Sequence, residues 1–157
     1  MKILLTAFRG SSAEALIKDW EAYPKIIFPN HKVRDSELLK DVISKQNYDY
    51  IISFGQKPNI KDKVYIETTG KQGNICMETS FPWDMLRRLL QEKGLCVKVS
   101  QNAGTSFCNQ LYFNGLRYLQ ESNADTKMIF IHIPFEKNIS DLKWSQTQLY
   151  HVLEQLK

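Results

Sequence analysis

The stretch 128–133 limits the possible folds of this chain more than any other part of its sequence. Five of its six residues are apolar, the sixth is His132, and Pro134 follows directly. A strand that is apolar on both faces is typical of a parallel sheet, because the crossover helices of such a sheet cover both of its sides. The stretch therefore predicts a buried strand in an α/β protein that has helices on both faces of its sheet.

The rest of the chain alternates between the sequence periods of strands and of helices. Further strands are predicted at 3–7, 25–28, 49–54, 63–67 and 96–99. Amphipathic helices are predicted at about 12–21, 36–43, 83–93 and 108–119, and from 145 onward. The polar stretch 68–80 has no period and is predicted to be a loop. This order predicts a single domain over 1–157, a three-layer α/β/α sandwich with a mostly parallel, twisted central sheet.

Composition argues against several classes of protein. No stretch is long and apolar enough to cross a membrane, and the net charge of +4 comes from lysines and arginines spread along the chain. We therefore expect neither a membrane protein nor a nucleic-acid-binding surface. The three cysteines are an odd number, and neither they nor the histidines have metal-ligand spacing. This pattern argues against a zinc site and favours a reducing, cytoplasmic context.

Cys108 stands in the first turn of a predicted helix that follows a strand and a turn containing Gly104. The unpaired backbone N–H groups and the dipole of a helix N-terminus favour a thiolate over a thiol. The same groups stabilise an oxyanion that forms when a thiolate attacks a carbonyl. Cysteine is also among the most buried residue types, and Cys108 lies on the apolar stripe of its helix. A nucleophile and a structural cysteine therefore both remain open from position alone.

His132 and Glu67 supply the other parts of a cysteine-hydrolase triad. A histidine takes the thiol proton and returns it to the leaving amine, and a carboxylate holds the imidazole in the required tautomer. Both residues lie at the ends of predicted strands, as do Phe8 and Gln56. The carboxyl ends of parallel strands meet at one edge of a sheet, where ligands bind. The structural alternatives are a hydrogen-bonded core histidine and a solvated glutamate at a strand edge.

Four segments of the chain carry a resemblance to a known family. Segment 99–109 reads Val-Ser-Gln-Asn-Ala-Gly-Thr-Ser-Phe-Cys-Asn, and segment 130–134 reads Phe-Ile-His-Ile-Pro. The opening segment 1–8 and the pair Gly55-Gln56, followed by Ile66-Glu67, add weaker similarity. Together they resemble the signatures of pyroglutamyl peptidase I, the pyrrolidone-carboxylate peptidases of peptidase family C15.

The resemblance implies an exopeptidase that removes an N-terminal pyroglutamyl residue from peptides without a metal or an organic cofactor. It implies Cys108 as the nucleophile, His132 as the general acid and base, and Glu67 as the orienting acid. The backbone N–H of Cys108 would contribute to the oxyanion hole. The implied partner is a peptide with N-terminal pyroglutamate, and a homo-oligomer stays open.

The resemblance also implies the residues that hold the lactam ring. Phe8 would stack on the flat ring, Gln56 would define its polar edge, and Phe107 would line the pocket. Phe8 is followed at once by Arg9 instead of the family's second aromatic segment, and the chain is shorter than usual between Glu67 and Cys108. These differences keep two further hypotheses in view: a cysteine hydrolase with altered acyl specificity, and a non-catalytic relative that binds a peptide end or another protein.

Overall fold

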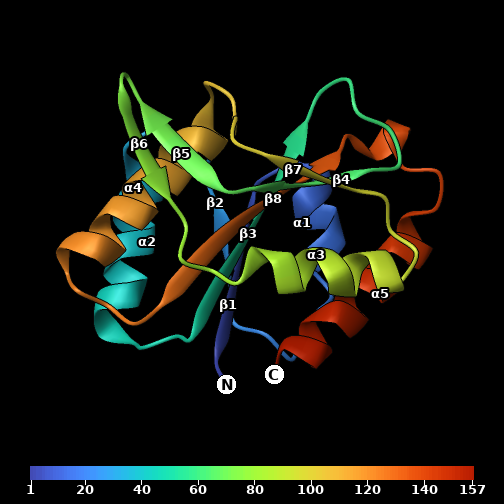
Figure 1. Ribbon diagram of the computed structural model, residues 1–157, viewed down its shortest axis with the longest axis horizontal. Helices are drawn as coiled ribbons and strands as arrows, with labels where there is room; N and C mark the ends of the chain where they lie inside the picture. Colours follow the sequence, from blue (N-terminus) through green and yellow to red (C-terminus); the bar gives the residue numbers. More distant parts are fainter.

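Six strands form the central sheet of the computed structural model, which describes residues 1–157 (Figure 1). Their order across the sheet is β2-β1-β3-β8-β4-β7. Their bounds are Ile3–Phe8 (β1), Lys25–Phe28 (β2), Tyr50–Lys57 (β3), Val64–Glu67 (β4), Val97–Ser100 (β7) and Lys127–Pro134 (β8). The predicted strands are therefore all present, with ends that shift by at most three residues.

Helices cover both faces of this sheet, which confirms the three-layer α/β/α architecture (Figure 1). The helices are Ser12–Ile17 (α1), Arg34–Lys45 (α2), Trp83–Glu92 (α3), Phe107–Glu121 (α4) and Leu142–Leu156 (α5), with a short 3-10 turn at Glu136–Asn138 (η1). Helices α1, α3 and α5 lie on one face, and α2 and α4 lie on the other. None of these helices combines the length and the apolar character needed to cross a bilayer.

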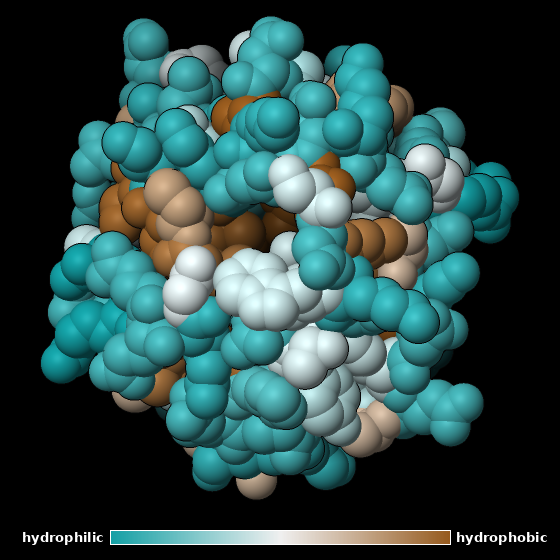
Figure 2. Space-filling model, turned by 90° about the vertical axis from the view of Figure 1, so that its right-hand side faces the viewer, coloured by the Kyte–Doolittle hydropathy of each residue, from teal (hydrophilic) through white to brown (hydrophobic).

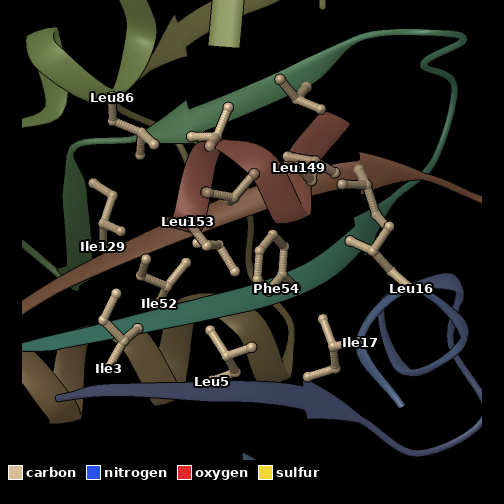
Figure 3. Close-up of a cluster of buried hydrophobic side chains, with 14 of the residues drawn as sticks. Ile3, Leu5, Leu16, Ile17, Ile52, Phe54, Leu86, Ile129, Leu149 and Leu153 are labelled. Atoms are coloured by element: carbon tan, nitrogen blue, oxygen red, sulfur yellow. The ribbon is translucent and has the colours of Figure 1, made fainter. Parts of the chain in front are cut away.

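Strand β8 confirms the prediction that the stretch 128–133 is buried on both sides. Ile129 and Ile131 belong to the larger apolar cluster, together with side chains of α1, α3 and α5, and Figure 3 shows Ile129 within it. Met128 and Phe130 point the other way, into the cluster formed with α2 and α4. The alternation follows from the strand period of two, which sends successive side chains to opposite faces.

The sheet is mostly parallel, but its strands do not all run in one direction. Strands β2, β1, β3 and β8 are parallel, whereas β4 pairs antiparallel with β8, and β7 is parallel to β4. The C-terminal residue of β4, Glu67, therefore lies opposite Phe130 in the middle of β8. The expectation that Glu67 shares the edge formed by the carboxyl ends of β1, β3 and β8 is wrong. Local sequence pattern does not encode the direction in which a strand pairs.

The predicted loop at 68–80 is wrong, because this stretch forms a two-stranded hairpin. Its strands are Thr69–Gln72 (β5) and Ile75–Glu78 (β6), joined at Gly73, whose φ of 57° suits glycine. The hairpin lies beside α4 (Figure 1), and a Cβ on Gly70 would come within 2.8 Å of the Phe113 backbone. The two-residue Gly-Asn turn between the strands is a recognised hairpin signal, but the short strands show no alternation of apolar and polar residues.

Two predicted helix ends are also wrong. Helix α1 ends at Ile17, well before Glu21. Helix α5 begins at Leu142, three residues before the predicted Ser145, because the Asp141 side chain accepts a hydrogen bond from the backbone N–H of Trp144. Aspartate is a favoured N-cap residue, so this start follows a known rule.

Candidate active site

His132 and Glu67 reach one another because they stand on adjacent antiparallel strands. In the pairing of β4 with β8, Tyr65 lies opposite His132 and Glu67 lies opposite Phe130. Side chains two residues apart on a strand share a face, so His132 and Glu67 are diagonal neighbours on the side covered by α4. The His132 Nδ1 atom lies 2.8 Å from Glu67 Oε1, and both side chains are buried.

This contact fixes the chemical form of the histidine. A carboxylate only accepts hydrogen bonds, so Nδ1 carries a proton, and in the neutral imidazole the free lone pair is on Nε2. Burial raises the pKa of Glu67, but hydrogen bonds, first from His132 and then from neighbours that include Lys57, outweigh it and bring the pKa below its ordinary value. Glu67 is therefore an anion at neutral pH, and it orients the His132 ring through Nδ1.

Lys57 is a member of this cluster that the sequence analysis missed. Its Nζ donates to Glu67 Oε1 at 3.0 Å and to the backbone oxygen of Asn102 at 3.1 Å. The same ammonium lies 4.7 Å from the centre of the Tyr65 ring. The predicted strand ended at Phe54, whereas β3 continues to Lys57. The sequence signal for Lys57 is its position directly after the candidate residue Gln56.

Cys108 approaches the same cluster from α4. A Cβ placed on Gly55 would lie 2.7 Å from its Sγ, and Gly55 is the neighbour of His132 across the pairing of β3 with β8. The ring of Phe130 would lie 2.8 Å from the same Cβ and is 4.9 Å from the His132 ring. The sulfur therefore lies over the strands that carry Gly55 and His132. The structure records no hydrogen bond between Cys108 and His132.

The resting state of Cys108 differs from the expectation. Burial raises the pKa of the Cys108 thiol to about 12, although a hydrogen bond from Ser106 and the residue's own N–H act in the opposite direction. The helix N-terminus therefore does not produce a thiolate in the substrate-free site, and the expectation of a lowered pKa is wrong. Only 7% of the residue's surface is exposed, so desolvation of the charged form outweighs the dipole.

This raised pKa predicts a pH-dependent contribution of Cys108 to stability. The unfolded thiol ionises near its ordinary pKa of 9.0, whereas the native thiol stays protonated up to about 12. The contribution is therefore fully present below pH 9 and is lost as the pH rises toward 12. Thermal unfolding of wild type and Cys108→Ala between about pH 7.5 and 11 should show that wild type loses stability more steeply. Parallel curves for the two proteins would contradict this assignment, because every other ionisable group is common to both.

The start of α4 leaves hydrogen-bond donors free for an oxyanion. The side chain of its N-cap residue, Ser106, caps none of the backbone N–H groups of the helix. The first backbone hydrogen bond at this end runs from Gln110 N to Ser106 O. The N–H groups of Phe107, Cys108 and Asn109 therefore have no carbonyl partner, as is usual in a first helical turn. Such donors beside a nucleophile provide the elements of an oxyanion hole.

The candidate lactam-binding residues lie in three different surroundings. Phe8 is buried in an aromatic cluster, 5.6 Å from Phe28 and 6.5 Å from Phe130 between ring centres. The Gln56 Oε1 atom accepts a hydrogen bond from the N–H of Ser12 at the start of α1. Phe107 is largely accessible at the start of α4, with 37% of its surface exposed. The structure thus joins Phe8 to the cluster around His132 and Cys108, and their roles toward a ligand remain predictions.

An apolar cavity of about 240 Å³ lies away from these groups. It opens beside α5, and Figure 2 shows apolar surface in a hollow among hydrophilic side chains on that side. Its apolar lining includes Leu16, Val64, Leu95, Ile133 and Leu149. None of the triad candidates lines this cavity.

Comparisons with known proteins agree with this geometry. A family model described as pyroglutamyl peptidase matches residues 58–147. Pyrrolidone-carboxylate peptidases of Bacillus cereus and Bacillus anthracis are 28% identical over 167 residues, which cover 85% of this chain and 78% of each relative.

Solved structures show the same fold. The pyrrolidone carboxyl peptidase of Fervidobacterium islandicum AW-1 superposes with a TM-score of 0.85 at 19% identity, covering 99% of this chain and 98% of that one. Two mutants of the Pyrococcus furiosus protein each give a TM-score of 0.83 at 16% identity, covering 98% of this chain and 97% of theirs. The family model spans more than half of the sequence, and the chain therefore belongs to the pyroglutamyl peptidase family.

Proposed function

We propose that this protein is a cysteine exopeptidase that hydrolyses the amide bond after an N-terminal pyroglutamyl residue of peptides. The observation that carries the proposal is the buried hydrogen bond between Glu67 and His132, on the sheet face that α4 covers with Cys108. Family membership supplies the reaction class, because its relatives are pyrrolidone-carboxylate peptidases. A thiol, an imidazole and a carboxylate are sufficient for acyl transfer through a thioester.

The reaction begins from a neutral thiol, because burial keeps the Cys108 pKa high. Nε2 of His132 removes the thiol proton as Sγ attacks the pyroglutamyl carbonyl carbon. The free N–H groups at the start of α4 stabilise the resulting oxyanion. Glu67 remains a carboxylate and stabilises the imidazolium through Nδ1.

The same histidine completes the cycle. Collapse of the tetrahedral intermediate breaks the C–N bond, and His132 gives its proton to the leaving amine of the shortened peptide. The pyroglutamyl group then remains on Sγ as a thioester. His132 next removes a proton from water, which attacks the thioester and releases pyroglutamate and the Cys108 thiol.

The surroundings of Cys108 suit a neutral acyl group. Its cluster contains Phe8 and Phe130, and the nearby cation Lys57 is already bonded to Glu67 and Asn102. A neutral five-membered lactam needs an apolar slot and a few hydrogen bonds instead of a charged clamp. Because Phe8 is buried in the substrate-free structure, we propose that lactam binding requires a local rearrangement near this ring.

The direct test is release of a fluorogenic amine from a pyroglutamyl amide. Wild type should release it, and Cys108→Ala should lower kcat/KM by about 10³-fold or more, because only binding and the oxyanion donors remain. Cys76→Ala, which removes an exposed cysteine, should keep wild-type activity. A folded wild type that cleaves other N-acyl amides through Cys108, but not this one, would favour altered acyl specificity. A folded wild type that cleaves neither the pyroglutamyl amide nor other N-acyl amides would favour the hypothesis of a non-catalytic relative that binds a peptide end or another protein.

A further inference from the structure

The Glu67 carboxylate has an uneven hydrogen-bond environment. Oε1 receives donors from both His132 and Lys57, whereas the buried Oε2 has no partner. The side chain is fully buried, while that of Lys57 is 25% exposed. A buried carboxylate needs a compensating charge, because removing an anion from water costs several kcal/mol. When His132 is neutral, Lys57 is the charge that supplies this compensation.

Lys57 also joins two parts of the site, the Glu67 carboxylate and the turn that contains Asn102. It ends β3, and its second hydrogen bond reaches the backbone oxygen of Asn102, in the turn before α4. Asn102 is itself held in that turn, since its N–H donates to Ser100 Oγ and its Oδ1 accepts from the Gly104 N–H. The ammonium therefore links the acid of the triad to the segment that leads to the nucleophile.

We propose that Lys57 is a positioning residue that acts through Glu67, so that the working unit of this site is Cys108, His132, Glu67 and Lys57. It holds the carboxylate oxygen against Nδ1 of His132, and it fixes the turn that sets the start of α4. Lys57 does not touch the reacting atoms. The inference rests on the proposed function for its kinetic test, but not for its spectroscopic one.

The charge of Lys57 also sets the pH range in which the pair of Glu67 and His132 can act. Tyr65 lies on the same face of β4 as Glu67, beside Lys57, and Cys108 and Tyr112 approach Glu67 from α4. Burial raises the pKa of both Cys108 and Tyr112, so they stay neutral. Lys57 is thus the one permanent cation beside the pair. Without it, the pair holds a proton more tightly, and loss of that proton, which frees Nε2 as a base, requires a higher pH.

The kinetic test compares three variants with wild type on the pyroglutamyl amide. Lys57→Met should lower kcat by about tenfold or more with little change in KM, and it should move the acid limb of kcat upward by about one pH unit. Lys57→Arg keeps the charge and should retain the wild-type limb. Lys61→Met, at an exposed lysine in the following turn, is the matched control and should change neither quantity. If Lys57→Met folds poorly, Lys57→Gln tests the loss of charge while keeping a donor for Asn102.

Two further measurements separate this inference from the proposed function. NMR titration of the His132 ring needs no substrate, and its midpoint should rise in Lys57→Gln but not in Lys57→Arg. In a Glu67→Gln background, Lys57→Met should change kcat much less than in wild type, because the two residues act as one unit. An unshifted NMR midpoint and acid limb in folded Lys57→Gln would overturn the inference. A shifted midpoint without pyroglutamyl hydrolysis would keep it and reject the proposed substrate.

Discussion

Replacing Glu67 by glutamine is expected to lower kcat by about 10⁴-fold, with the fold retained. The amide has almost the same shape as the carboxylate, but its NH₂ group can donate to Nδ1 and so favour the tautomer that carries the proton on Nε2. In that form His132 cannot accept the thiol proton. The amide also has no charge to stabilise the imidazolium. The measurement is kcat for the pyroglutamyl amide, with thermal unfolding as a check on folding.

Glu78→Gln is the matched control for this substitution. Glu78 ends β6 and is exposed, so its replacement should leave kcat unchanged. The pH dependence of stability gives a second readout. The lowered pKa of Glu67 means that its contribution to stability is present above its ordinary pKa of 4.5 and is lost as the pH falls below it. Glu67→Gln should remove this acid-dependent part. Hydrolysis near the wild-type rate would show that His132 does not depend on Glu67.

Gly55→Ala is expected to reduce activity by roughly 10²-fold or more and to destabilise the fold by about 1–3 kcal/mol. The added methyl group would lie 2.7 Å from Cys108 Sγ and 2.8 Å from the Phe130 ring, closer than such contacts allow. The ring is packed among Phe8, Tyr112 and His132, so it has little room to move. The sulfur must therefore shift away from its position over β3 and β8.

Gly115→Ala is the control that separates the effect of displacing the Cys108 sulfur from the general cost of adding a methyl group to a packed site. Its methyl group would lie 2.6 Å from the Met128 sulfur, which is a comparable clash. A methionine side chain is flexible and adapts to such a change. Gly115→Ala should therefore change kcat little, whereas Gly55→Ala should lower both kcat and the melting temperature. Equal kcat values for the two variants would show that Cys108 does not need the space above Gly55.

Much of the fold could be predicted from the sequence, since it depends on local periods. The apolar run at 128–133 and the amphipathic stripes of α2, α3 and α4 specify their elements without reference to neighbours. The direction of β4 could not be predicted in this way, because pairing depends on which strand edge is free. The hairpin β5–β6 could not be predicted in this way because its short strands have no apolar period and it depends on packing against α4.

The candidate site, like the fold, could be predicted from the sequence only in part. Sequence pattern and resemblance indicated Cys108, His132 and Glu67, and the structure brings His132 and Glu67 into direct contact. Lys57 was not foreseen, because a lysine after Gly55-Gln56 resembles a solvated loop residue until β4 is placed beside β8. The protonation state of Cys108 was also not foreseen. It depends on the balance between burial and the helix N-terminus, and only the folded structure shows that burial prevails.

The buried, protonated state of Cys108 affects the sensitivity of the protein to oxidants. Peroxides attack the thiolate, and the first oxidation product, a sulfenic acid, forms fastest at accessible sulfur atoms of low pKa. Cys108 has neither property at rest, whereas Cys76 and Cys96 are both exposed. Oxidative damage should therefore accumulate first on the two peripheral cysteines. Under the proposed mechanism, the Cys108 sulfur becomes vulnerable only during the brief interval in which His132 holds its proton.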